Sequence, residues 1–185
     1  FIGLEMAENL HDQGLDIAVV EMANQVMAPL DYSMAAIVHQ QLIEKKVDLR
    51  LEDGVLRFEE TDGGIIVHLK SGKQIPTDLV ILSIGVRPET KLAKEAGLAI
   101  GTLGGIAVND YMQTSDPDIY ALGDAVEVLK PVTGKPALIP LAGPANKQGR
   151  IVADNIVFGN RETYKGTIGT SIAKVFDITV AAAGA

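Results

Sequence analysis

The feature that most constrains the fold is the run Ile-Tyr-Ala-Leu-Gly-Asp at residues 119–124. Its β-prone and apolar residues predict a buried strand, and Gly123 then allows a sharp turn, so that Asp124 emerges at the strand's carboxyl end. In an open α/β sheet, ligands bind at that edge. A carboxylate there accepts hydrogen bonds from sugar or ribityl hydroxyls, and a glycine lets a pyrophosphate approach the backbone. The same Gly-Asp pair also fits an ordinary turn.

The composition indicates a globular protein and excludes several classes of function. The 185 residues, 47% hydrophobic and 22% charged, suit one large or two small domains. A net charge of −8 argues against nucleic-acid binding. The absence of cysteine excludes disulfides, thiolate metal sites and a cysteine nucleophile within this chain, and it fits a reducing compartment such as the cytoplasm. No apolar run approaches membrane-spanning length, and the three histidines show no metal-ligand spacing.

The first 21 residues predict a helix followed by a strand that ends in an acid. Residues 1–10 have helical spacing with Gly14 as a carboxyl-terminal cap, and residues 15–21 form a β-branched run that ends at Glu21. Gly3 precedes Glu21 by 18 residues, close to the spacing of about 20 between the Gly-rich turn and the ribose-binding acid of a dinucleotide fold. The alternative is a helix and a strand with a surface glutamate.

This spacing makes Gly3 the third glycine of a G-x-G-x-x-G turn, with the first two glycines and their strand before Phe1. We therefore expect a truncated domain, in which the strand at residues 17–20 has an unfilled position beside it. A ribose-binding Glu21 would repel a 2′-phosphate, and the next three residues include no arginine, so the pattern favours NADH over NADPH.

The next segment predicts a capped helix and then three short strands. Asp31 is a suitable N-cap for a helix whose apolar face is Met34, Ile37, Val38 and Leu42, with His39 on the solvated flank. The strands at 55–58, 65–69 and 73–75 are separated by Asp-Gly-Gly and Lys-Ser-Gly turns and form an antiparallel meander.

Residues 78–85 are apolar on both faces, which predicts a central strand that breaks at Gly85. Gly85 would let a cofactor approach the backbone, whereas a structural role is favoured for Arg87, and a domain boundary is expected at residues 85–88.

Farther along, Pro144 lies near the start of a helix with Ile151, Val152 and Ile156 on its apolar face. The free N–H groups of that helix suit an anion or an electron-rich ring edge, although most helix ends bind nothing.

Consecutive blocks along nearly the whole chain resemble the FAD-dependent pyridine nucleotide-disulfide oxidoreductases, most closely the branch of coenzyme A-disulfide reductase, NADH oxidase and NADH-dependent persulfide reductase. The blocks are Phe-Ile-Gly-Leu-Glu-Met-Ala-Glu (1–8), Val-Glu (20–21), Ile-Gly-Val-Arg-Pro (84–88), Thr-Ser-Asp-Pro-Asp-Ile-Tyr-Ala-Leu-Gly-Asp (114–124), Leu-Ala-Gly-Pro-Ala-Asn-Lys-Gln-Gly-Arg (141–150) and Lys-Val-Phe-Asp-Ile-Thr-Val (174–180).

The resemblance implies an α/β fold: a Rossmann-like NADH-binding domain with an inserted antiparallel meander at 1–86, the returning part of an FAD-binding α/β domain at 87–160, and the start of a dimerisation domain at 161–185. It also implies cofactor-binding roles at seven positions. Toward NADH, Gly3 would close the phosphate turn, Glu5 would lie near the nicotinamide, Glu21 would bind the adenosine ribose, and Gly85 would lie beside the dinucleotide. Toward FAD, Gly123 and Asp124 would contact the pyrophosphate and ribityl region, and Ala142 would contact the flavin through its backbone.

The implied function is transfer of hydride from NADH to FAD and of electrons onward to a disulfide, persulfide or oxygen, in a homodimeric parent protein. The family's redox-active cysteine is absent from this chain. Two alternatives remain: a ferredoxin-reductase-type flavoprotein without a redox cysteine, which the parent sequence upstream would distinguish, and a non-catalytic dinucleotide-binding fragment, which would bind NADH without electron transfer.

We expect this chain alone to be inactive on disulfides and to retain FAD poorly, because the FAD-binding amino-terminal strand and turn of the family lie outside it. The absorbance spectrum of the purified chain tests this expectation. A stoichiometric flavin spectrum would contradict it.

Overall fold

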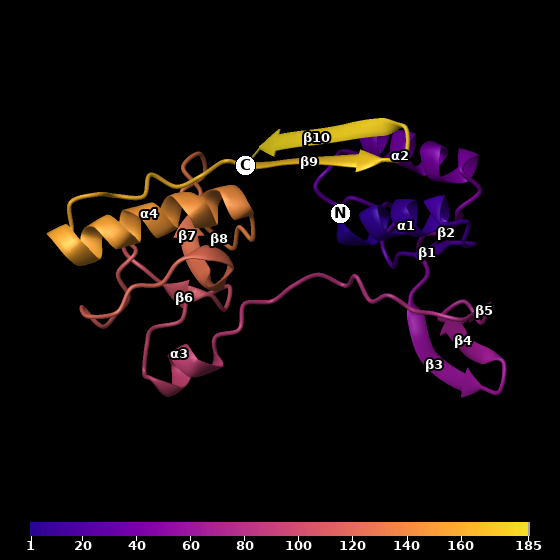
Figure 1. The fold of residues 1–185 in the computed structure, drawn as a ribbon, viewed down its shortest axis with the longest axis horizontal. Coiled ribbons are helices and arrows are strands. Elements are labelled where there is room, and N and C mark those ends of the chain that lie inside the picture. Colours follow the sequence, from indigo (N-terminus) through magenta and orange to yellow (C-terminus); the bar gives the residue numbers. More distant parts are fainter. Residues whose placement is uncertain (185) are drawn as a thin grey trace. The chain divides into compact units, whose positions relative to one another are not determined.

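The computed structural model describes residues 1–184, which form two compact units (Figure 1). The first comprises Phe1–Ile84 and Ser171–Ala182, and the second comprises Gly85–Thr170 and the described residues from 183 onward. Both contain helices and strands, which confirms the predicted α/β class. The functional division at 1–86, 87–160 and 161–185 stays a prediction, and its last residue lies outside the described part.

The first unit begins with two helices that alternate with two strands. α1 (Ile2–Asp12) leads to β1 (Ala18–Val20), and α2 (Tyr32–Glu44) leads to β2 (Asp48–Arg50). β1 and β2 are parallel, with Val19 opposite Leu49. Gly14, at φ +84°, ends the α1 region as its sequence predicts. This order is the β–helix–β unit that parallel pairing requires.

β1 has β2 as its single hydrogen-bonded neighbour among residues 1–184, so its opposite edge is unpaired, as expected.

The prediction of a central strand at residues 78–85 is wrong. This segment forms no strand, and Leu79, Leu82 and Ile84 are exposed by 63%, 64% and 87%. A strand that is apolar on both faces needs neighbouring strands and covering layers. The described residues supply no neighbour, so the apolar pattern alone does not produce a strand.

The predicted meander is confirmed. β3 (Val55–Thr61), β4 (Gly64–Leu69) and β5 (Gln74–Thr77) form an antiparallel sheet in chain order (Figure 1). The short turn that joins β4 to β5 includes Lys70 and Ser71, and Lys70 N–H donates to the carbonyl of Gly54 over 2.8 Å. The meander is therefore tied at that turn to the chain that follows β2.

A hairpin from the far end of the sequence completes the first unit. β9 (Gly169–Val175) and β10 (Ile178–Gly184) run beside the two helices (Figure 1). Phe176, 4% exposed, meets the His11 ring edge-on at 5.1 Å, and its N–H donates to Glu8 over 2.8 Å. Lys174 Nζ also donates to Glu8, and this bond holds the pKa of the Glu8 carboxyl below its usual range. The hairpin thus fixes α1.

The predicted face of α2 is only half correct. Val38 and Leu42 are buried, whereas Met34 and Ile37 are more than half exposed. His39, expected on the solvated flank, is buried, and its Nε2 accepts a hydrogen bond from Val26 N–H at 3.2 Å. Burial lowers the pKa of His39, which favours the neutral imidazole that this bond needs. The polar partner that decides which face is buried comes from a loop, and helical spacing does not reveal it.

The second unit places one long helix against small strands. α3 (Lys91–Glu95) precedes a three-stranded sheet of β6 (Ile106–Ala107), β7 (Val126–Leu129) and β8 (Pro136–Ala137), and α4 (Ala142–Phe158) follows it. Met112, Val126 and Val152 form the centre of its core. No helix within residues 1–184 is long and apolar enough to cross a membrane.

The strand predicted at residues 119–122 is also wrong. This run makes one isolated bridge, between Tyr120 and Gln113, and Leu122 is 38% exposed. The turn after it is present as predicted: Gly123 has φ +78° and begins the short 3₁₀ helix η1 (Gly123–Ala125). On α4, Val152 is buried as expected, but Ile156 is 62% exposed.

We expect Phe176→Ala to destabilise the first unit by about 3 kcal/mol or more, because it removes a buried aromatic ring from between α1 and the hairpin. Urea unfolding followed by circular dichroism measures the change. Phe58→Ala is the matched control, since Phe58 on β3 is 45% exposed and its loss should cost far less. Equal losses for the two variants would contradict the hairpin's role in the core.

Candidate functional site

The start of α1 presents unpaired backbone donors beside two predicted site residues, Gly3 and Glu5. The N–H groups of Leu4 and Glu5 bond to the carbonyl of Phe1 at 3.1 and 3.0 Å, which leaves those of Ile2 and Gly3 without an intrahelical partner. Phe1, the N-cap, makes no side-chain cap bond. The positive end of the helix dipole adds to these donors, so this end suits a phosphate group.

The backbone of Gly3 is closely approached by another segment. A Cβ added to Gly3 would lie 3.1 Å from Cβ of Ser83, so a larger residue would push against that segment. The Glu5 side chain is exposed, and its backbone carbonyl accepts a bond from Asn9 at 2.7 Å. Glu5 is therefore free to contact a ligand at the start of the helix.

Glu21 follows β1 directly and is half-buried. Its N–H donates to the carbonyl of Arg50 over 2.8 Å, which continues the pairing of β1 with β2, and its Oε1 accepts the N–H of Ala23 at 2.8 Å. These bonds fix the carboxylate at the carboxyl end of the strand. Its Oε2 makes no hydrogen bond to the described residues and remains available to hydroxyl groups.

Gly85 has φ +89°, a conformation that favours glycine, and no atom lies within 4 Å of where its Cβ would be. It is exposed in the extended segment after Ile84. By its contacts Gly85 belongs to the second unit, whereas Gly3, Glu5 and Glu21 belong to the first.

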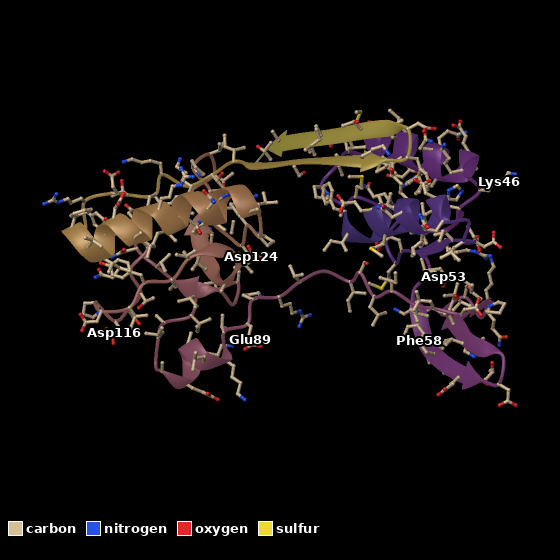
Figure 2. All side chains as sticks on the ribbon, viewed as in Figure 1. Lys46, Asp53, Phe58, Glu89, Asp116 and Asp124 are labelled. Atoms are coloured by element: carbon tan, nitrogen blue, oxygen red, sulfur yellow. The ribbon has the colours of Figure 1, made fainter. Side chains whose placement is uncertain are left out.

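In the second unit, α4 fixes the Gly123 turn. Gln148, 2% exposed on α4, accepts the N–H of Gly123 through Oε1 at 2.7 Å. A Cβ on Gly123 would lie 3.7 Å from Cβ of Ala145, so turn and helix pack closely. Asp124 is exposed at the surface of this unit (Figure 2). The sequence does not reveal Gln148 as a partner of this turn, because the two are 25 residues apart.

A cavity of about 380 Å³ opens at the start of α4. Its lining includes Ala142, Gly143 and Lys147 from the helix. Leu141, the N-cap, makes no side-chain cap bond, so the first N–H groups of the helix are not capped by a side chain. α4 therefore connects the two predicted blocks: it contains Ala142, and its Gln148 bonds to Gly123, which precedes Asp124.

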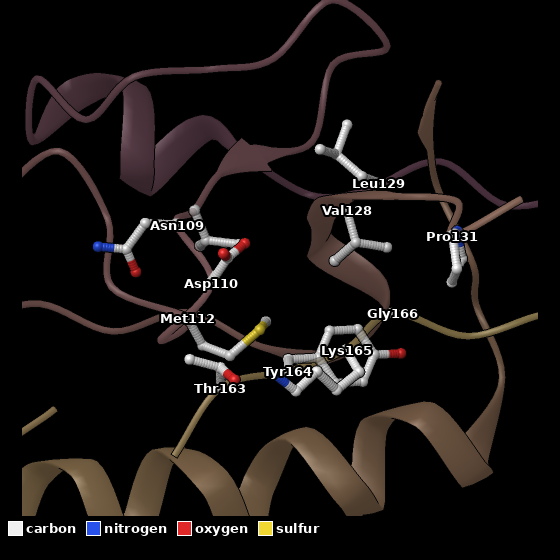
Figure 3. Close-up of a pocket in the computed structure, with 11 residues that line it drawn as sticks. Asn109, Asp110, Met112, Val128, Leu129, Pro131, Thr163, Tyr164, Lys165 and Gly166 are labelled. Carbon is white, nitrogen blue, oxygen red and sulfur yellow. The ribbon is translucent and has the colours of Figure 1, made fainter. Parts of the chain in front are cut away.

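A second cavity, of about 250 Å³, lies elsewhere in the same unit (Figure 3). Met112, Val128 and Tyr164 line it, and the buried Tyr164 Oη has no hydrogen-bond partner among residues 1–184. None of the predicted site residues lines this cavity. It therefore gives no support to a cofactor role.

Residues 1–149 match the sequence profile of the pyridine nucleotide-disulphide oxidoreductases. The chain belongs to this family. An NADH oxidase of Methanocaldococcus jannaschii is 39% identical over 184 residues, an alignment that covers 99% of this chain and 40% of that protein. The chain spans about 40% of the length of curated relatives that it matches.

Solved structures of the family have the same fold. The reduced CoADR-RHD protein of Bacillus anthracis is 56% identical with a TM-score of 0.94, covering 99% of this chain and 32% of that one. A NAD-dependent persulfide reductase from A. fulgidus is 43% identical with a TM-score of 0.95, covering 100% and 34%. An FAD-dependent family member from Desulfovibrio vulgaris is 40% identical with a TM-score of 0.91, covering 100% and 47%.

Gly123→Ala should destabilise the second unit by about 1–2 kcal/mol, because φ +78° is unfavourable for a residue with a Cβ. Thermal or urea unfolding measures the loss. Gly149→Ala is the control: Gly149 lies within α4, has open space around its Cβ position, and should gain up to about 1 kcal/mol from the better helix propensity of alanine. A neutral Gly123→Ala would show that the turn tolerates a side chain.

Proposed function

We propose that this chain is the part of an NADH-dependent flavoprotein oxidoreductase that binds the dinucleotide and one side of the flavin cofactor. The observation that carries the proposal is the pair of helix starts, on α1 and α4, each accompanied by a glycine and an acid at the predicted positions. The family membership and the NAD- and FAD-dependence named for its relatives support it.

In the first unit, the free N–H groups of Ile2 and Gly3 would hold the pyrophosphate of NADH at the positive end of α1. Glu21, oriented by the Ala23 N–H, would accept hydrogen bonds from the adenosine ribose through its free oxygen. Glu5, exposed in the first turn, would lie on the nicotinamide side. Gly85, the first residue of the second unit, would let a cofactor approach its own backbone.

In the second unit, the residues fit the role expected toward FAD. Asp124 is exposed and would accept hydroxyl bonds, and Gly123 would allow the pyrophosphate near the backbone. The start of α4 at Ala142 would place N–H groups and the helix dipole at the flavin. The cofactors supply hydride and electron transfer, and the chain supplies binding, orientation and a favourable electrostatic environment.

The electron acceptor of the parent protein is proposed to be a small disulfide, a persulfide or oxygen, in line with the names of its relatives. We also propose a homodimeric parent in the cytoplasm, without a nucleic-acid or membrane partner. The family resemblance supports the dimer, and the absence of cysteine in this chain fits a reducing compartment.

Glu21→Ala in the full-length protein should raise the Kd for NADH about 10- to 100-fold, because it removes a charged acceptor of ribose hydroxyl bonds. Titration of NADH fluorescence measures this. Glu60→Ala is the matched control, since Glu60 lies exposed on β3, away from the end of β1, and should leave the Kd unchanged. An unchanged Kd in Glu21→Ala would remove the main support for the dinucleotide site.

A further inference from the structure

A lysine from the meander lies beside the residue that follows Glu21. Lys70 Nζ is 3.6 Å from Sδ of Met22, although the two residues are 48 positions apart. Met22 begins the stretch that passes the ribose end of a dinucleotide when Glu21 binds that ribose. The sequence around Glu21 offers no cation, and the fold supplies one from another sheet.

The backbone that carries Lys70 is anchored to this stretch by several hydrogen bonds. Lys70 N–H donates to the carbonyl of Gly54 at 2.8 Å, and Ser71 N–H donates to the Asp53 carboxylate at 3.0 Å. Asp53 N–H in turn donates to the carbonyl of Glu21 at 3.2 Å. The turn between β4 and β5 and the end of β1 are therefore connected through Asp53.

The small size of Gly54 leaves room for the lysine side chain. A Cβ on Gly54 would lie 3.2 Å from both Cδ and Cε of Lys70 and 3.5 Å from its Nζ. The aliphatic part of Lys70 therefore crosses directly over this glycine. Packing of this kind restricts the lysine to fewer rotamers and directs its ammonium group toward Met22.

The neighbouring charges leave Lys70 available for an anion. Arg50 pairs with Asp48 through two bonds of 2.8 and 2.9 Å. Asp53 accepts both the N–H and the hydroxyl of Ser71, and these bonds, with the nearby Lys73 and Arg50, hold the pKa of Asp53 below its usual range. Lys70 has no carboxylate within 4 Å in the described part of the chain.

We propose that Lys70 adjusts dinucleotide specificity by donating hydrogen bonds to the 2′-phosphate of NADPH, so that NADPH is a second, weaker donor beside NADH. This inference rests on the proposed dinucleotide site. Glu21 disfavours a phosphate at the ribose, and a cation nearby accommodates it. Lys70 offsets part of the repulsion from Glu21 without contributing to the binding of NADH, whose ribose carries a neutral hydroxyl.

The test compares the Kd of NADH and NADPH in the full-length protein by fluorescence titration. Lys70→Met, which keeps the aliphatic stem, should raise the Kd for NADPH about three- to tenfold and change that for NADH by less than about twofold. The effect should shrink in 0.5 M salt because the contact is exposed to solvent. Lys70→Arg should preserve NADPH binding.

Lys73→Met is the control, because Lys73 lies in the same turn and interacts electrostatically with Asp53. The inference would be overturned if Lys70→Met changed the Kd of NADH and NADPH equally, or if it raised the Kd for NADPH no more than Lys73→Met does. It would also be overturned if the wild-type protein bound NADH but showed no measurable binding of NADPH. Failure of the wild type to bind either dinucleotide would instead overturn the proposed function.

Discussion

The first unit depends on contacts between the two ends of the described chain. Glu8 on α1 accepts hydrogen bonds from Lys174 and Phe176 of the hairpin, and Phe176 is buried against the same helix. These bonds satisfy a carboxylate that burial would otherwise penalise. The hairpin thus holds the carboxyl-terminal half of α1, the helix that carries the free N–H groups at its start. The proposed phosphate site therefore depends on residues that make no contact with a phosphate.

Local signals predicted most of the elements correctly. Glycines at 14 and 123 mark backbone turns with positive φ, and the turn residues of the meander separate three strands as expected. These features follow from neighbouring residues, since a glycine permits its conformation whatever packs nearby. The family resemblance supplied the rest of the functional interpretation, which composition and spacing alone left open between a ligand site and a simple turn.

The two wrong strands show what sequence patterns omit. Residues 78–85 and 119–122 have strand-like composition, yet a strand is defined by the bonds to a neighbour, and the described residues give these segments one isolated bridge at most. His39 is a similar case, because its burial depends on a loop amide at Val26. For the two segments the deciding fact is the lack of a pairing strand among the described residues, and for His39 it is a partner 13 residues away. Local sequence periodicity does not reveal whether such partners are present.

The same reasoning applies to the candidate sites. Each combines a local motif, which sequence reveals, with a distant side chain, which it does not: Gln148 bonds to the Gly123 turn, and Lys70 lies beside Met22 after Glu21. The local motif sets which class of ligand fits, through a glycine, an acid and a helix start. In the proposed sites, the distant residue would adjust how that ligand is held. In the proposed dinucleotide site, Glu21 of the local motif would disfavour the 2′-phosphate that distinguishes NADPH from NADH, and the distant Lys70 would offset part of that repulsion.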